Sequence, residues 1–194
     1  MNNNEKQKPL RWLMRIALTA LFAALTAAGA FIAIPVGPVP IVLQNLFALL
    51  SGLVLGPVLG SAAVGLYLLA GLLGFPVFSG GGGGIARFAG PTGGYLVGYL
   101  LAALTAGLIA GRPGANTNAK AFQIRIILAV VAGFLVIYVP GLIWLKTRLN
   151  LDLIKTLLTG LVPFIIGDAL KGIAAVLIAP RLGRIAADFL DDKS

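Results

Sequence analysis

The sequence contains no cysteine and no histidine, and charged residues make up only 11% of its 194 positions. These absences exclude disulfides, thiolate nucleophiles, iron–sulfur clusters, zinc or haem sites with histidine ligands, and catalytic triads built on histidine. No glycine-lysine dipeptide occurs, so the phosphate-binding loop of many ATPases is absent as well. A metal site built from carboxylates alone remains possible, but the chain has only six acidic residues. We expect no catalytic residue, no resident cofactor and no metal site.

Hydrophobic residues are correspondingly abundant. They form 59% of the chain, whereas soluble domains have about 45–50% apolar residues. A chain of this length cannot bury so much apolar surface within itself, so lipid is the simplest solvent for it. The formal net charge of +9 then indicates cations gathered on one side of a membrane, and not binding to nucleic acid. We expect a single integral membrane domain over residues 1–194.

Six apolar segments approach or reach the length of about 17–25 residues that a helix needs to cross a bilayer. Prolines and polar residues separate most of them, and the five consecutive glycines at 80–84 must form a loop. The predicted fold is an all-α polytopic membrane protein with six transmembrane helices and a glycine-rich external loop between the third and fourth. The predicted spans are 16–34, 41–55, 57–73, 93–110, 124–145 and 157–178, the last with Pro163 inside it.

An even number of spans places both ends of the chain on the same side of the membrane. Ten cations lie on that side and four on the other, and the side with more cations is usually cytoplasmic. We therefore expect a cell-membrane protein with cytoplasmic termini, whose tails cover about 1–14 and 181–194. A signal peptide would share the basic start, but the first apolar run is longer than a signal core. The ten cations are Lys6, Lys8, Arg11, Arg15, Arg112, Lys120, Arg125, Arg181, Arg184 and Lys193.

Two charged residues, Asp168 and Lys171, fall well inside the last predicted span. They are three positions apart and so share one face of a helix. Charges within a membrane are costly and usually face a cavity or each other. The pair is a candidate for binding a solute; the alternative is an ion pair that only locks the helices together.

The external loop over residues 79–95 holds further candidates. Glycines allow a backbone to come close to a ligand and offer N–H groups to it. Arg87 is the loop's only cation and could hold a carboxylate. Bulky residues within the loop favour a lid over a flexible linker. The candidate ligand-binding residues of this loop are Gly82, Gly83, Arg87, Phe88 and Tyr95.

Two amides, Gln44 and Asn45, open the short second span near the same face as the loop. An amide side chain can pair with a polar ligand or merely satisfy a neighbouring helix end. The sequence leaves both interpretations open, and we take Gln44 as a candidate ligand-binding residue.

Small residues line one face of the first span. Ala20, Ala24 and Ala28 recur every four residues, a spacing that permits close contact between helices. The stripe could pack inside the chain or form a docking face for a membrane partner.

Together these motifs resemble the BioY family, the biotin-binding S components (substrate-binding subunits) of energy-coupling factor (ECF) transporters. The resemblance extends from about residue 15 to 181 and implies a six-helix subunit that captures biotin outside the cell, as transported substrate and not as cofactor. The motifs stand in the family's order: residues 38–45 (PVPIVLQN), the serine-glycine loop, residues 90–95 (GPTGGY), and Asp168 with Lys171 after Gly167.

The resemblance also implies partners, namely a transmembrane coupling subunit and two cytoplasmic ATPase subunits. The family's first helix carries an Ala-x-x-x-Ala docking pattern, which Ala20, Ala24 and Ala28 match. Asp168 could accept a ureido N–H of biotin, and Lys171 could donate to the ureido carbonyl. Some relatives have an arginine where Gly82 stands, so the contact to the biotin carboxylate is open here.

Other functions remain as alternatives. One is a self-sufficient vitamin carrier, another an S component for a different small vitamin, and both share the candidate residues. An intramembrane enzyme using Asp168 is less favoured, because a catalytic carboxylate usually needs a second acid, a metal or a histidine nearby. A purely structural scaffold explains neither the charged pair nor the glycine loop.

Overall fold

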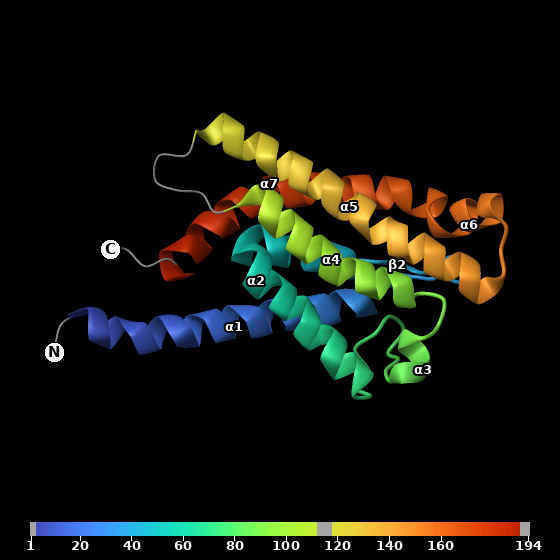
Figure 1. Cartoon of the computed structure of the whole chain (residues 1–194), viewed down its shortest axis with the longest axis horizontal. Coiled ribbons are helices and arrows are strands. Elements are labelled where there is room, and N and C mark those ends of the chain that lie inside the picture. Colours follow the sequence, from blue (N-terminus) through green and yellow to red (C-terminus); the bar gives the residue numbers. More distant parts are fainter. Residues whose placement is uncertain (1–2, 112–117, 191–194) are drawn as a thin grey trace.

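The computed structural model describes residues 3–111 and 118–190, and these residues are mostly helical (Figure 1). Five long helices form the body of the molecule: α1 (Asn3–Phe31), α2 (Gln44–Leu72), α4 (Gly93–Ala110), α5 (Ala119–Leu149) and α7 (Ile165–Leu190). The shorter elements are α3 (Ile85–Phe88), α6 (Leu153–Gly160), the 3₁₀ turn η1 (Val162–Phe164), and the antiparallel strands β1 (Ala33–Ile34) and β2 (Ile41–Val42).

Helix α2 contains most of the second and third predicted spans, although the first residues of the second, Ile41–Val42, form β2. Gly56 separates them with a backbone φ of 81° and ψ of 179°, a conformation that glycine adopts readily, and Pro57 then starts the second half. The two halves contact each other across the break, where the Ser51 hydroxyl donates a hydrogen bond to the Gly60 carbonyl at 3.1 Å. Five stretches of the described residues are long and apolar enough to span a membrane, and the break in α2 reconciles this number with the six predicted spans.

The predicted last span, 157–178, lies within the stretch Leu153–Ala187 that is long and apolar enough to cross a membrane, but it is not one continuous helix. Pro163 lies in η1, which separates α6 from α7, so the chain breaks where the sequence predicted only an internal proline. Asp168 therefore lies in the first turn of α7 and not in the middle of an unbroken helix. A carboxylate is favoured there, because the first turn of a helix carries partial positive charge.

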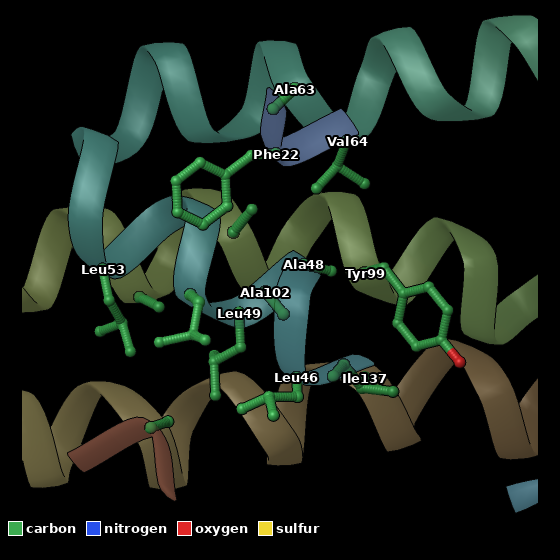
Figure 2. Packing of buried hydrophobic residues seen from close by; sticks show 14 of the residues in the cluster. Phe22, Leu46, Ala48, Leu49, Leu53, Ala63, Val64, Tyr99, Ala102 and Ile137 are labelled. Carbon is green, nitrogen blue, oxygen red and sulfur yellow. The ribbon is translucent and has the colours of Figure 1, made fainter. Parts of the chain in front are cut away.

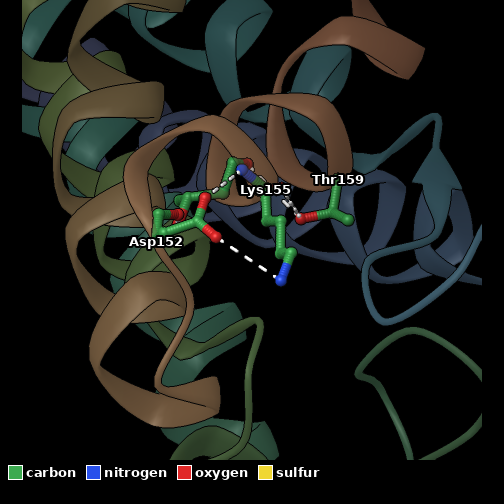
Figure 3. A network of polar contacts seen from close by, with 4 residues as sticks. Asp152, Lys155 and Thr159 are labelled. Carbon is green, nitrogen blue, oxygen red and sulfur yellow. Dashed lines mark hydrogen bonds and ion pairs between the residues drawn. The ribbon is translucent and has the colours of Figure 1, made fainter.

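The start of α6 holds a second Asp–Lys pair, which Figure 3 shows with Thr159. Asp152 caps α6 by accepting from the Lys155 backbone N–H at 2.8 Å, and its other oxygen lies 3.5 Å from Lys155 Nζ. Both side chains are exposed, at 57% and 71%. Such a pair contributes little to stability, typically about 0–1 kcal/mol.

The helices lie side by side with both chain ends at one end of the bundle. Figure 1 shows α1 beginning, α7 ending, α4 ending and α5 beginning at this end, which we call the termini end. The β1–β2 hairpin, α3 and the α5–α6 turn lie at the opposite end, the loop end. The arrangement agrees with the even number of crossings predicted. Arg112 and Lys193, two of the cations counted on the termini side, lie outside the described residues.

The core lies where α2, α4 and α5 meet, and α1 covers one side of it (Figure 2). Small residues allow the helices to approach closely: a Cβ atom at Gly52 would lie 2.1 Å from the Ala103 carbonyl oxygen, and one at Gly133 would lie 2.3 Å from Leu49. Large apolar side chains are exposed on the outer surface of the helices, as expected for a surface in contact with lipid.

Candidate functional site

Asp168 is the centre of a buried polar network that joins three helices. Its Oδ1 atom accepts from Lys171 Nζ at 2.8 Å and from Asn45 Nδ2 at 2.9 Å, while Oδ2 accepts from the Tyr138 hydroxyl. Asp168, Lys171 and Asn45 are 7%, 8% and 6% exposed. The predicted charged pair is therefore a buried ion pair on α7, tied to α2 by Asn45 and to α5 by Tyr138.

Asn45 has one polar atom that the network leaves unused. Its Nδ2 must face Asp168, because a carboxylate can only accept hydrogen bonds. This fixes the position of Oδ1, which is buried and has no hydrogen-bond partner among the described residues. A buried acceptor without a donor costs about 1–3 kcal/mol. The amide therefore presents an acceptor that a bound N–H group would satisfy.

A cavity of about 290 Å³, counting its open side, lies against this network. Its polar end is formed by Asn45, Tyr138, Asp168 and Lys171. The rest of the wall is apolar or aromatic and comes from the hairpin segment, α4, α5 and η1. These remaining lining residues are Val39, Pro40, Val42, Tyr95, Tyr99, Ile137 and Phe164.

A second cavity of about 350 Å³ adjoins the first and leads to the glycine-rich loop. The two cavities share the walls formed by the hairpin segment, Tyr95 and Tyr99. Gln44, Phe78, Ser79 and Arg87 line only the second of the two. The Asp168–Lys171 pair thus lines one cavity and Arg87 lines the other, and Tyr95 and Tyr99 line both.

Arg87 and the glycines of the loop fit around each other. The guanidinium donates to the Ser79 carbonyl at 2.8 Å. A Cβ atom on Gly82 would lie 2.9 Å from Arg87 Nε, and one on Gly83 would lie 2.3 Å from the Phe75 carbonyl oxygen. The Gly82 N–H already donates to the Phe78 carbonyl at 3.2 Å, so the open N–H group that the sequence suggested is not free there.

The other predicted ligand-binding residues occupy different places. Tyr95 lines both cavities, and its buried hydroxyl donates to the Gly160 carbonyl at 2.8 Å. Gln44 lines the second cavity and donates to the Tyr67 hydroxyl at 2.5 Å. Phe88 packs against Phe78 with ring centroids 6.3 Å apart. Phe88, Gly82 and Gly83 are not among the residues that line either cavity.

The alanine stripe of α1 faces outward. Ala20, Ala24 and Ala28 are all exposed, whereas Phe22, Ala23 and Thr26 make the inner face of the helix. Internal packing of the stripe, one of the two interpretations of the sequence, therefore does not occur within the described part of the chain.

Two tyrosines that line the first cavity, Tyr99 and Tyr138, were not predicted from the sequence. Tyr99 lies four positions after Tyr95 and so shares its helix face, a spacing that could have revealed it. Tyr138 is a hydroxyl-bearing residue within the apolar α5. Only its hydrogen bond to Asp168 in the structure identifies it as part of the polar network.

The comparisons with known proteins agree with one another. The model of the BioY family matches residues 2–188. The "Probable biotin transporter BioY" of Pyrococcus horikoshii is 42% identical over 86% of this chain and 94% of the relative. The "Biotin transporter BioY" of Lactococcus lactis subsp. cremoris is 37% identical over 94% of both chains.

A solved structure is similar over nearly the whole molecule. It is a crystal structure of the S-component for biotin from an ECF-type ABC transporter. The two chains are 34% identical, the TM-score is 0.76, and the match covers 95% of each chain.

Proposed function

Because the chain belongs to the BioY family, we propose that it is the membrane-embedded, biotin-binding subunit of an ECF-type uptake system. The two relatives are named biotin transporters, and the similar solved structure is the S-component for biotin. The polar and aromatic residues that line the two adjoining cavities suit biotin chemically. The observation that carries the proposal is the unpartnered Oδ1 of Asn45 beside the Asp168–Lys171 pair, in the first of the two adjoining cavities, which is lined largely by apolar and aromatic residues.

The polar side of the first cavity matches a ureido group. That group has two N–H donors and one carbonyl acceptor. Asn45 Oδ1 accepts one N–H, and Asp168 Oδ2, which takes a single hydrogen bond from Tyr138, has capacity for the other. Lys171 has two further hydrogens beyond the one on Asp168 and donates to the ureido carbonyl. Asp168 thereby both anchors three helices and contacts the ligand.

The second cavity, which Arg87 lines, matches a carboxylate. Arg87 is positioned by Ser79 and by the glycines that surround it. A guanidinium suits a carboxylate because it donates two parallel hydrogen bonds. Tyr95 and Tyr99 line both cavities, Gln44 supports the wall through Tyr67, and Gly82 leaves room for Arg87 where some relatives carry an arginine.

We assign the remaining predicted features in the same way. The termini end is cytoplasmic, from the excess of cations on that side, and the loop end faces the outside of the cell membrane. The exposed stripe of Ala20, Ala24 and Ala28 docks against the transmembrane coupling subunit, since small residues permit close approach. Two cytoplasmic ATPase subunits supply the energy, because the chain has no phosphate-binding loop of its own.

The experiment that tests the ligand assignment compares biotin with its methyl ester on purified protein in lipid nanodiscs. Calorimetry should show biotin binding without ATP or a partner. Arg87→Gln should weaken biotin by roughly 10- to 100-fold, the value of a lost charge-assisted hydrogen bond, and should change methyl ester binding little. No binding of biotin would refute the function. Equal weakening of both ligands would show that Arg87 shapes the loop and does not hold the carboxylate.

Uptake into vesicles separates a dependent subunit from a self-sufficient carrier. Vesicles that contain only this chain should bind biotin but not accumulate it. Accumulation without the coupling subunit and the ATPases would favour the self-sufficient carrier.

A further inference from the structure

A groove outside the ligand site runs along the outer surface between α5 and α7. Its volume is about 1210 Å³ counting its open side, and apolar side chains from both helices form most of its lining. It lies within two of the stretches that can span a membrane, Ala119–Leu149 and Leu153–Ala187. The exposed apolar residues of its rims are Ile127, Val131, Leu135, Ile165, Ile173 and Leu177.

Two small residues of α7 are among those that line the groove. Ala169 and Gly172 both line it, and a Cβ atom on Gly172 would already lie 3.3 Å from Val130 and 3.5 Å from Phe134. No large side chain from α7 fills the space at these two positions. An apolar space of this kind does not hold ordered water, so its natural occupant within a bilayer is a hydrocarbon chain.

Cations lie beyond the groove toward the termini end. Arg181 and Arg184 follow Leu177 by four and seven positions on α7, with Pro180 between Leu177 and Arg181, and Lys120 precedes Ile127 by seven on α5. On a helix, residues at these spacings lie on about the same face. All three are exposed. None has an ion-pair partner among the side chains that the structure describes.

We propose that this groove binds an anionic phospholipid, with an acyl chain between α5 and α7 and the phosphate on Lys120, Arg181 and Arg184. Basic residues at the mouth of an apolar space between transmembrane helices favour an anionic headgroup over a neutral one. The combination of charge and apolar depth distinguishes the site from an ordinary lipid-facing surface, where only the apolar part is present.

The position of the groove gives the lipid a structural role. Tyr138 and Asp168 line both the groove and the first cavity, so these two side chains lie between the two spaces. An acyl chain in the groove covers their outer side and keeps water away from the ion pair. The inference itself needs only the membrane location and not the identity of the transported ligand.

Photolabelling tests the proposal. The full chain is placed in phosphatidylcholine liposomes that contain phosphatidylglycerol or phosphatidylcholine carrying a diazirine in one acyl chain, and labelled peptides are mapped by mass spectrometry. Phosphatidylglycerol should label the α5 and α7 groove peptides in preference to phosphatidylcholine. The outward face of α1 provides the reference and should show no such preference.

Two test variants, each with a matched control variant, decide the outcome. Arg181→Gln with Arg184→Gln should lower the phosphatidylglycerol preference by roughly 10-fold or more, whereas Lys146→Gln with Arg148→Gln, at the other end of α5, should preserve it. Ala169→Trp should fill the groove and reduce labelling by both probes, unlike Leu170→Trp. Equal labelling by the two lipids, or a preference that survives loss of both arginines, would overturn the proposal.

Discussion

Removing Lys171 separates the structural contribution of the buried ion pair from its contribution to ligand binding. In Lys171→Met, Asp168 stays buried with hydrogen bonds from Asn45 and Tyr138 but without a counter-charge. Breaking a buried pair by removing one partner costs about 3–5 kcal/mol. Lys155→Met is the matched control, because Asp152 and Lys155 have the same spacing but are exposed, and its cost should be about 0–1 kcal/mol.

The second charge can be removed without rebuilding the network. In Asp168→Asn, the retained oxygen can still accept from Lys171 and Asn45. The new amide nitrogen then faces Tyr138, whose hydroxyl can accept as well as donate. The double variant Asp168→Asn with Lys171→Met contains no unpaired charge. We expect its thermal stability to be higher than that of Lys171→Met alone.

Biotin affinity provides the second measurement. Each single variant loses a charged partner of the ureido group, worth about 1.5–3 kcal/mol, so affinity should fall by roughly 10- to 100-fold. In the double variant, stability should recover while affinity stays low. Calorimetry on protein that remains monodisperse measures affinity, and thermal unfolding in the same detergent measures stability. Recovered stability together with unchanged affinity would refute a ligand role for the pair.

Three further predictions concern the loop, the docking stripe and the orientation. Gly82→Ala should displace the neighbouring guanidinium and weaken biotin more than its methyl ester, whereas Gly65→Ala, which meets open space, should leave both unchanged in calorimetry. Ala24→Trp should keep biotin binding but abolish uptake and co-purification with the coupling subunit. An impermeant thiol reagent applied to cells should label Ile85→Cys and spare Asn3→Cys, a test that the absence of native cysteine makes clean.

Each of these has an outcome that contradicts it. Normal binding of biotin by Gly82→Ala would mean that the loop adjusts around the added methyl group. Normal uptake by Ala24→Trp would exclude the stripe as the docking face; Leu21→Trp, another exposed α1 position, serves as its control. Labelling of Asn3→Cys alone would reverse the orientation.

Local signals in the sequence predicted the fold well wherever the backbone chemistry is unambiguous. The glycine run could only be a loop, and the Gly56–Pro57 pair separates two spans that the structure places in one bent helix. Pro163 was harder to interpret, because a proline inside a helix can cause a kink or a complete break. The structure resolves this as a 3₁₀ turn and a new helix, which moves Asp168 to a helix start.

The site was predicted less completely because its decisive features involve residues distant in sequence. Asp168 and Lys171 could be chosen because charge within an apolar span is rare. The free acceptor of Asn45 could not be foreseen, since it depends on a carboxylate 123 positions away that fixes which way the amide points. The close fit of Gly82 against Arg87 likewise depends on how the loop folds back on itself.

The polar network has one atom, Asn45 Oδ1, without a hydrogen-bond partner among the described residues. Asp168 links α2, α5 and α7 through Asn45, Tyr138 and its own position on α7, so the network consists of side chains from this chain alone. Under the proposed assignment, a ligand N–H supplies the donor that Asn45 Oδ1 lacks among the described residues, and a buried acceptor without a donor costs about 1–3 kcal/mol. A ligand that lacks this donor would leave the cost in place. A site of this kind therefore selects against analogues without the N–H more strongly than it attracts the correct ligand, because it penalises an unpaired buried group.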